Sequence, residues 1–187
     1  MISSENIVAC ICEGNSEKYI MSILLEKDKL IFSEDQLLDN QFFQGKYRNP
    51  EVFSAQYLTM DYKDPEIGLR EVVVLVVKDD KRNYVIKKPY SDRVKSKYLV
   101  VTSPELEMLM IHASGLYDEY KNKYSGKNPS LFLADEWGKR RSIIKSEKFI
   151  RDFFEKNSLV DAIKQHSQKT KRVNQYMFLA DFLKKDA

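Results

Sequence analysis

Three groups of acidic residues in this chain each come shortly after a short apolar run. The acids and their runs are Glu13 after residues 7–12, Asp79 and Asp80 after 71–77, and Glu105 and Glu107 after 98–102. Apolar runs without alternation are typical of strands that are buried on both faces. Ligands of an open parallel α/β sheet bind outside the carboxyl ends of its strands. We therefore expect these carboxylates to converge on one edge of a mostly parallel sheet.

Carboxylates gathered at one edge repel one another unless a cation lies between them. Mg²⁺ or Mn²⁺ suits such a site because hard cations take oxygen ligands. The expected catalytic and metal-binding residues are Glu13, Asp79, Asp80 and Glu107. Each acid also has a plain structural explanation: Glu13 as a cap of a turn, either aspartate as a turn residue, and Glu107 as an exposed charge at a helix start.

The first half of the chain predicts an α/β fold. Ser16 is a plausible helix N-cap, and the apolar spacing after it predicts a helix over residues 17–26. Pro50 is well placed to begin a second helix that runs to residue 59. Residues 30–32 and 84–87 are candidate short strands, in addition to the three buried runs.

The second half predicts mainly helices. Residues 104–123 carry an apolar face at helical spacing, whereas residues 125–138 indicate a loop with a turn at Asn128-Pro129. Further helices are expected at 145–156, 159–167 and 172–185, the last two as a hairpin that packs on the sheet. We therefore expect an α/β domain over residues 1–125 and a helical C-terminal extension, residues 126–187, packed on the same domain.

The charge of the chain is uneven, although its net value is only +3. Residues 139–172 hold eleven Lys or Arg against four Asp or Glu, and residues 78–97 hold eight against three. Such tracts favour an acidic partner, and nucleic acid is the expected one. The residues expected to contact it are Lys81, Arg82, Lys139, Arg140 and Arg141. The alternative is an ordinary solvated helix surface.

The remaining reactive side chains indicate no further site. Cys10 and Cys12 share one side of a strand and lack the partners of a zinc site, so we expect buried, reduced thiols. His112 and His166 fit structural roles, and Trp137 is either a base-stacking residue or a hydrophobic plug. With no signal peptide and no apolar run of transmembrane length, a cytoplasmic protein without a membrane partner is expected.

Three segments resemble a known family. VACICEGNSE, followed by a helix, is similar to the opening of Toprim domains, where a strand ends in Glu-Gly. EVVVLVV followed by KDD resembles the Toprim strand that delivers an Asp-x-Asp pair, and TSPELEMLMIH resembles the Asn-Pro-x-x-Glu segment of RloB-like Toprim proteins in bacterial defence loci. The resemblance, to RloB-like and OLD-type Toprim proteins, covers residues 7–112.

The resemblance implies a Toprim-like sheet flanked by helices, with Glu13 as a metal ligand or general acid/base, Asp79 or Asp80 as a Mg²⁺ ligand and Glu107 as an additional ligand. The implied activity is metal-dependent cleavage of phosphodiesters in nucleic acid, in phage defence, with a partner ATPase or another defence protein. The sequence departs from the pattern because Lys81 and Arg82 stand where the second aspartate would be. The alternative is therefore a catalytically degenerate Toprim-like module that binds nucleic acid or a partner protein.

Overall fold

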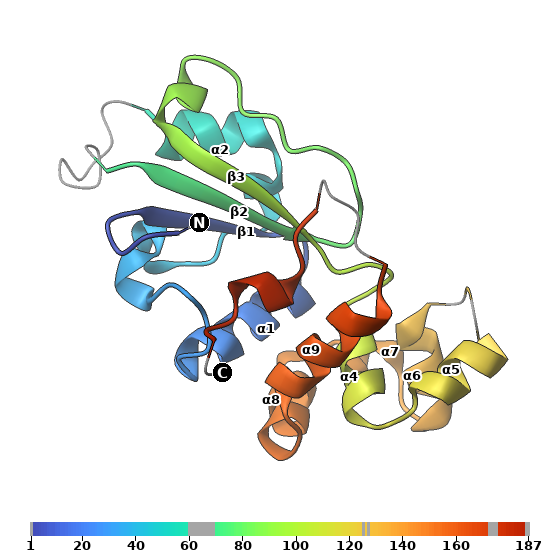
Figure 1. Cartoon of the computed structure of the whole chain (residues 1–187). Helices are drawn as coiled ribbons and strands as arrows, with labels where there is room; N and C mark the ends of the chain where they lie inside the picture. Colours follow the sequence, from blue (N-terminus) through green and yellow to red (C-terminus); the bar gives the residue numbers. More distant parts are fainter. Residues whose placement is uncertain (1, 60–69, 125, 127, 172–175, 186–187) are drawn as a thin grey trace.

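Three parallel strands form the centre of the molecule. The structure is a computed structural model, and it describes residues 2–59, 70–124, 126, 128–171 and 176–185. Strands β1 (Ile7–Cys12), β2 (Val72–Lys78) and β3 (Val94–Val101) pair in the order β1-β2-β3, all parallel (Figure 1). The chain thus has an α/β fold with a parallel sheet flanked by helices. The three predicted strands are present, although β3 begins four residues earlier than expected and only its last two residues are buried.

The side chains of β1 and β2 alternate between two hydrophobic clusters, one on each face of the sheet. Val8, Cys10 and Cys12 of β1 belong to the cluster that contains α1 (Asn15–Glu26). Ile7, Ala9 and Ile11 belong to the other cluster, which contains α2 (Pro50–Tyr57). Every residue of β1 is buried, so the cysteines are buried free thiols, as predicted. Full burial of a Val, Leu or Ile side chain contributes about 1.5–3 kcal/mol, so the two strands anchor both clusters.

Segments without regular strand structure cover both edges of the sheet. On the β1 side, Leu37 and Phe43 form single parallel bridges to Val8 and Ile11. On the β3 side, the C-terminal segment bridges Val100 through Met177. Covered edges leave fewer backbone groups open to pairing with other chains.

Six further helices follow β3 in the described part of the chain. They are α4 (Met108–Ala113), α5 (Tyr117–Tyr124), α6 (Pro129–Glu136), α7 (Arg141–Ile144), α8 (Glu147–Lys156) and α9 (Leu159–Lys169). Figure 1 shows them grouped beside α1, whereas α2 lies across the sheet from them. α8 packs on α1 and α9 packs on α4, so the late helices join the cluster on the α1 face.

Several predicted helices have different bounds in the structure. The single helix predicted over 104–123 is wrong: it is α4 and α5, separated at Gly115, whose φ of 71° is outside the helical range. The loop predicted over 125–138 is also wrong, because α6 occupies most of it with Pro129 in its first turn. The first helix begins at Asn15 with Gly14 as its N-cap, so Ser16 is not the cap. The predicted start at Pro50 is confirmed, with Asn49 capping α2.

The helical hairpin predicted at the C-terminal end is wrong in the residues that the structure describes. Residues 172–175 lie outside them, and the segment that follows is extended apart from a short 3₁₀ turn, Leu179–Phe182. Two predicted short strands are also absent. Leu30 makes one antiparallel bridge, with Leu183, and Tyr84 is buried without pairing as a strand, its hydroxyl donating to the Tyr47 carbonyl at 2.9 Å.

None of the helices in the described residues is both long enough and apolar enough to cross a membrane.

Candidate functional site

A groove of about 350 Å³ opens at the carboxyl edge of the sheet. We call it the acidic groove, because most of its charged lining is acidic. Its carboxylates are Glu13, Glu17, Asp79, Glu105 and Glu107, and its cations are Arg48 and Lys145. The parallel register of the strands brings these segments together, since β1, β2 and β3 all end at this edge. The expected convergence of Glu13, Asp79 and Glu107 is therefore what the structure shows.

Glu13 joins the ends of β1 and β2. Its Oε2 accepts a hydrogen bond from the backbone N–H of Asp79 at 3.0 Å. Burial raises the pKa of Glu13, and the nearby Asp79 and Asp80 carboxylates add to that effect, although the hydrogen bond from the Asp79 N–H acts against it. The raised pKa means that the surroundings of Glu13 disfavour the charged form of its carboxyl group.

Glu17 is the acid that the sequence analysis did not select. Its Oε2 accepts from the Gly14 N–H at 3.1 Å, and its side chain is buried. A Cβ at residue 14 would lie 2.8 Å from that oxygen, so the glycine leaves room for the carboxylate. Burial raises the pKa of Glu17 to about 7, and Glu107 and Glu13 contribute by repulsion. The available signal was its position four residues after Glu13, on the first turn of a helix that leaves the same edge.

Glu107 closes the groove from the segment after β3. It is 2% exposed; the Ser16 hydroxyl donates to its Oε1 at 3.3 Å, and the Lys145 ammonium lies 3.5 Å from its Oε2. Burial raises the pKa of Glu107, while Lys145 acts in the opposite direction. A buried carboxylate so near an ammonium group shows that the groove already attracts a positive charge.

Glu105 has a different role from Glu107. Its carboxylate accepts from the Ser130 N–H at 3.0 Å and lies 3.4 Å from both Arg141 and Lys145. Although burial acts to raise it, the pKa of Glu105 is lowered by the hydrogen bonds from Ser130 and by Lys145. Glu105 therefore holds α6 and α7 at the sheet edge. Lys145 contacts both Glu105 and Glu107, so it links these helices to the acidic groove.

The two consecutive aspartates lie in different surroundings. Asp79 is exposed and lines the acidic groove, whereas Asp80 lines a neighbouring cavity. Asp80 pairs with Lys78 at 2.5 Å and with Arg82 at 3.1 Å. The hydrogen bond from Lys78 lowers the pKa of Asp80. Of the two expected ligands, Asp79 therefore lies with the other acids, and Asp80 is already neutralised.

The carboxylates of the groove are of the kind that a divalent cation binds, although they are not close enough together to hold one as they stand. Glu13, Glu17 and Glu107 all have raised pKa values, because burial disfavours their charged forms and neighbouring carboxylates add repulsion. Oxygen ligands of this kind are those that Mg²⁺ and Mn²⁺ prefer. In the described residues, however, no three acidic, His or Cys side chains are close enough to hold an ion as they stand. Ion binding would require side-chain movement at the groove.

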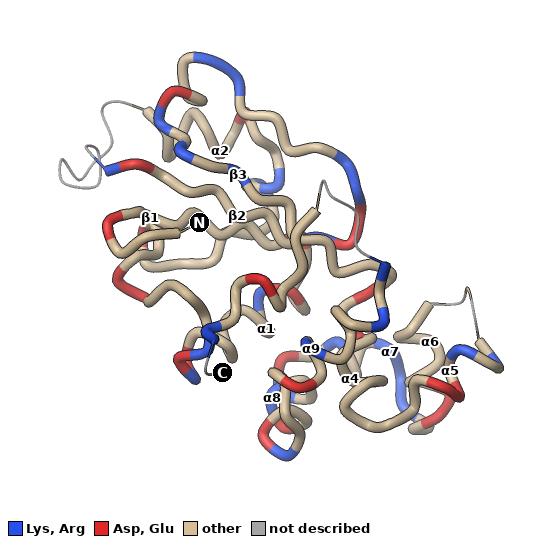
Figure 2. Tube along the Cα trace, viewed as in Figure 1, with Lys and Arg blue, Asp and Glu red and all other residues tan. Residues whose placement is uncertain are grey.

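The basic residues expected to bind nucleic acid fall into two groups, and Figure 2 shows Lys and Arg at both places, after β2 and around α7. Lys81 lies with its ammonium 6.0 Å from the Tyr176 ring, and the Arg82 side chain is 88% exposed. Lys139 and Arg140 are exposed at the start of α7. Arg141 differs, because its guanidinium donates to Ser130 Oγ at 2.9 Å and contacts Glu105.

The two histidines lie together outside the groove, with His112 buried and His166 half-buried. His112 Nε2 lies 3.3 Å from His166 Nδ1, and the His112 ring stacks on Tyr117. Burial lowers the pKa of His112 to about 4 and also lowers the pKa of His166. The pair packs α9 against α4, which is the structural role expected from the sequence.

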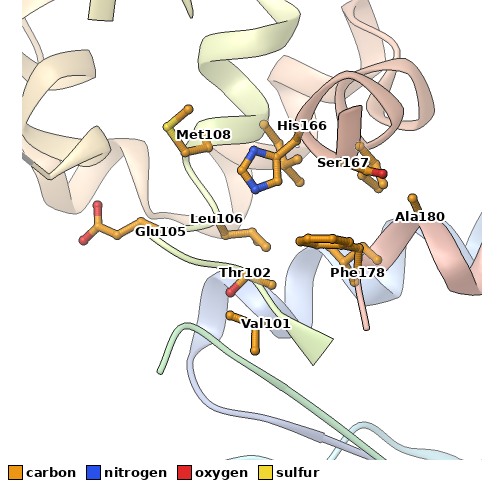
Figure 3. A pocket seen from close by; sticks show the side chains of 12 residues that line it. Val101, Thr102, Glu105, Leu106, Met108, His166, Ser167, Phe178 and Ala180 are labelled. Atoms are coloured by element: carbon orange, nitrogen blue, oxygen red, sulfur yellow. The ribbon is translucent and has the colours of Figure 1, made fainter. Parts of the chain in front are cut away.

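Figure 3 shows a small pocket beside His166, lined by Thr102, Leu106 and Phe178 among others. The Glu105 carboxylate points away from it in the figure. Its volume of about 10 Å³ is only enough for one water molecule. Trp137 meets the rings of Phe149 and Phe153 at 5.8 and 5.6 Å, so it is packed as a hydrophobic plug. None of these features competes with the groove as a functional site.

No protein-family model, no curated protein and no solved structure matches the chain.

Proposed function

We propose that this chain is a Toprim-like enzyme that cleaves phosphodiester bonds in nucleic acid with Mg²⁺ or Mn²⁺. The observation that supports the proposal is the acidic groove, where Glu13, Glu17 and Glu107 converge at the carboxyl edge of a parallel sheet and all have raised pKa values. Groups with perturbed pKa values in a cleft are typical of functional sites.

The residues that would hold the cation are Glu13, Asp79 and Glu107. A bound divalent cation would polarise the phosphoryl group and lower the pKa of an attacking water. Glu17, with a pKa of about 7, is suited to accept a proton at neutral pH. The Ser16 hydroxyl orients Glu107 from α1.

The basic residues around the groove would position the sugar-phosphate backbone of the nucleic acid. Lys81 and Arg82 lie directly after β2, next to Asp79, and Arg140 is exposed at the start of α7. Contacts of this kind fix the register of a nucleic acid without reading its sequence. The resemblance to RloB-like proteins extends the proposal to phage defence in the bacterial cytoplasm, with a partner ATPase or another defence protein.

A second candidate function is a catalytically degenerate Toprim-like module that binds nucleic acid or a protein. The observation that favours it is Asp80, which two cations neutralise away from the groove. The spacing of the acids favours it as well. In the described residues no three of them are close enough to hold an ion, and two-metal cleavage requires a full set of carboxylates.

Thermal melts and cleavage assays with Mn²⁺ distinguish the two functions. We expect Mn²⁺ to raise the Tm of the wild type and to support cleavage of single-stranded or duplex DNA or RNA. Both responses should be lost in Glu13→Gln, because only an ion bound to the native state stabilises it. The matched control is Glu155→Gln, an exposed glutamate of α8. A Tm that is indifferent to millimolar Mn²⁺ would reject the metal site, whereas a Mn²⁺ shift without cleavage would favour the binding module.

A further inference from the structure

A second cavity lies beside the acidic groove at the same edge of the sheet. Its volume is about 300 Å³, and we call it the basic pocket because Arg48, Lys78 and Arg82 line it. Glu13 and Arg48 line both the basic pocket and the acidic groove, so the two cavities adjoin. The proposed function uses Glu13 and Arg82 from its lining but gives no role to Arg48 or Lys78.

The pocket has more positive than negative charge. Lys78 and Arg82 share a single carboxylate, that of Asp80. Arg48 donates from Nε to the Gly45 carbonyl at 3.3 Å, and no carboxylate of the described residues lies within ion-pair distance of it. The remaining acid of the lining is Glu13, which belongs also to the acidic groove. With three cations and two acids in its lining, the pocket has an excess of positive charge and favours an anionic group.

The other part of the lining is apolar. Ile11 and Val76 project from the sheet face that carries α2, and Tyr84 packs beside them. All three are at least 96% buried, so they form a rigid floor that exposes little area to the pocket, and the half-buried Pro50 adds to the apolar lining. An apolar surface next to a cluster of cations suits a ligand that combines a ring with a phosphate. The volume is at the lower end for small-molecule pockets, which leaves room for one such unit.

We propose that the basic pocket binds one unpaired, phosphorylated nucleotide, with its phosphate at Arg48 and Arg82 and its ring on the apolar surface. The inference rests on the proposed function in one respect, because it makes this nucleotide the neighbour of the phosphodiester in the acidic groove. Since a paired base is stacked inside a duplex, a nucleotide must be unpaired to enter. The substrate class is therefore a single strand or a frayed end.

Calorimetric titration in EDTA tests the pocket without any metal. We expect thymidine 5′-monophosphate to bind at least tenfold more tightly than thymidine or inorganic phosphate. Arg48→Gln should weaken this binding about tenfold, as expected for one lost charged contact to phosphate. The matched control is Lys148→Gln, which removes one exposed positive charge of α8 outside the pocket and should bind like the wild type. Equal affinities for the nucleotide and phosphate, or equal effects of the two substitutions, would overturn the inference.

Cleavage of matched oligonucleotides separates this inference from the proposed function. With Mn²⁺, we expect a 5′-phosphorylated single strand to be cleaved at least tenfold faster than the blunt duplex of the same sequence, and Arg48→Gln to reduce that preference. Equal cleavage of both substrates would overturn the pocket inference and leave the nuclease intact. Nucleotide binding without Mn²⁺-dependent cleavage would support the pocket and reject the nuclease. A thermal melt of Arg48→Gln in EDTA checks that the variant is folded.

Discussion

The two cavities at the carboxyl edge of the sheet differ in how their charges are balanced. In the acidic groove, Glu13, Glu17 and Glu107 have raised pKa values and Lys145 is the cation placed among the acids. In the basic pocket, Asp80 has a lowered pKa and two cations within ion-pair distance. Asp79 and Asp80 are adjacent in sequence, yet each belongs to a different cavity.

The turn after β2 therefore places Asp79 and Asp80 in two cavities of opposite charge. The chain bends at residues 79 and 80, directly after the end of β2. Residues 78–80 therefore place one aspartate with the excess of acids and the other with the excess of cations. The acidic groove is short of positive charge, and the basic pocket is short of negative charge, which suits a cation in the first and a phosphate in the second.

The largest expected effect comes from the two aspartates. Asp79→Asn should reduce Mn²⁺-dependent cleavage by about 100-fold and shrink the Mn²⁺ shift of Tm, because it removes a ligand from the acidic groove. Asp80→Asn should keep the Mn²⁺ shift, since its carboxylate contacts Lys78 and Arg82 instead. Cleavage rates and melts with and without Mn²⁺ measure both. Equal losses in the two variants would contradict the separation of the two cavities.

The next largest effect is the contribution of Glu17 to the pH dependence of stability. Its pKa of about 7 in the native state is above its ordinary value of 4.5, so its contribution to stability is complete below pH 4.5 and is lost as the pH rises through 7. Without metal, Glu17→Gln should therefore be more stable than the wild type at pH 8 and close to it at pH 4.5. The difference should reach a few kcal/mol at most, since one pKa unit corresponds to about 1.4 kcal/mol.

Urea unfolding at several pH values measures this effect in EDTA. The wild-type curve alone is not sufficient, because His112 has the opposite dependence. Its pKa of about 4 lies below the ordinary 6.5, so its contribution is present above pH 6.5 and is lost as the pH falls towards 4. Subtracting the two curves cancels the histidine contribution. A difference that does not change with pH would contradict a raised pKa at Glu17.

A smaller effect is expected at Lys145. Its ammonium lies 3.4 Å from Glu105 and 3.5 Å from Glu107, so Lys145→Gln should cost the metal-free protein about 1 kcal/mol. The same substitution should enlarge the Mn²⁺ shift, because the ion then no longer competes with an ammonium group. Lys148→Gln, in an exposed position of α8, is the control. An unchanged or smaller Mn²⁺ shift would show that Lys145 does not compete for the groove.

The smallest effect separates two neighbouring arginines. Arg140→Gln should lower the salt dependence of nucleic-acid binding by about one unit of slope, as expected for one lost phosphate contact. Arg141→Gln should leave the slope nearly unchanged and lower the Tm, because Arg141 holds Ser130 and Glu105. Binding titrations at several salt concentrations give the slopes. A steeper loss for Arg141 than for Arg140 would reverse these two assignments.

The sheet and the meeting of its acids could be predicted because they depend on local patterns. Apolar runs without alternation identified β1, β2 and the second half of β3, and parallel pairing then brought Glu13, Asp79 and Glu107 together. The choice between Asp79 and Asp80 could not be predicted, because it depends on how the chain turns after β2. Lys145 also lacked a signal, since it reaches Glu107 only through the packing of α7.

The helical part was harder to predict, because its boundaries depend on single residues and on tertiary contacts. Gly115 ends a helix whose apolar pattern continues beyond it. Asn128-Pro129 was interpreted as a turn, although a proline in the first turn equally begins a helix. A helix is expected over residues 172–185, but Met177 pairs with β3 and Leu183 with Leu30.

The pairing of the C-terminal segment also bears on how the protein is made. Met177 forms a single bridge to Val100, and Leu183 forms one to Leu30. Residues from late in the chain thus pair with residues that come much earlier. During synthesis, β1, β2 and β3 are all translated before these partners exist. Until then the β3 edge is open to pairing with other chains, which is the usual route to aggregation. The β3 edge can therefore be covered only after Met177 has left the ribosome.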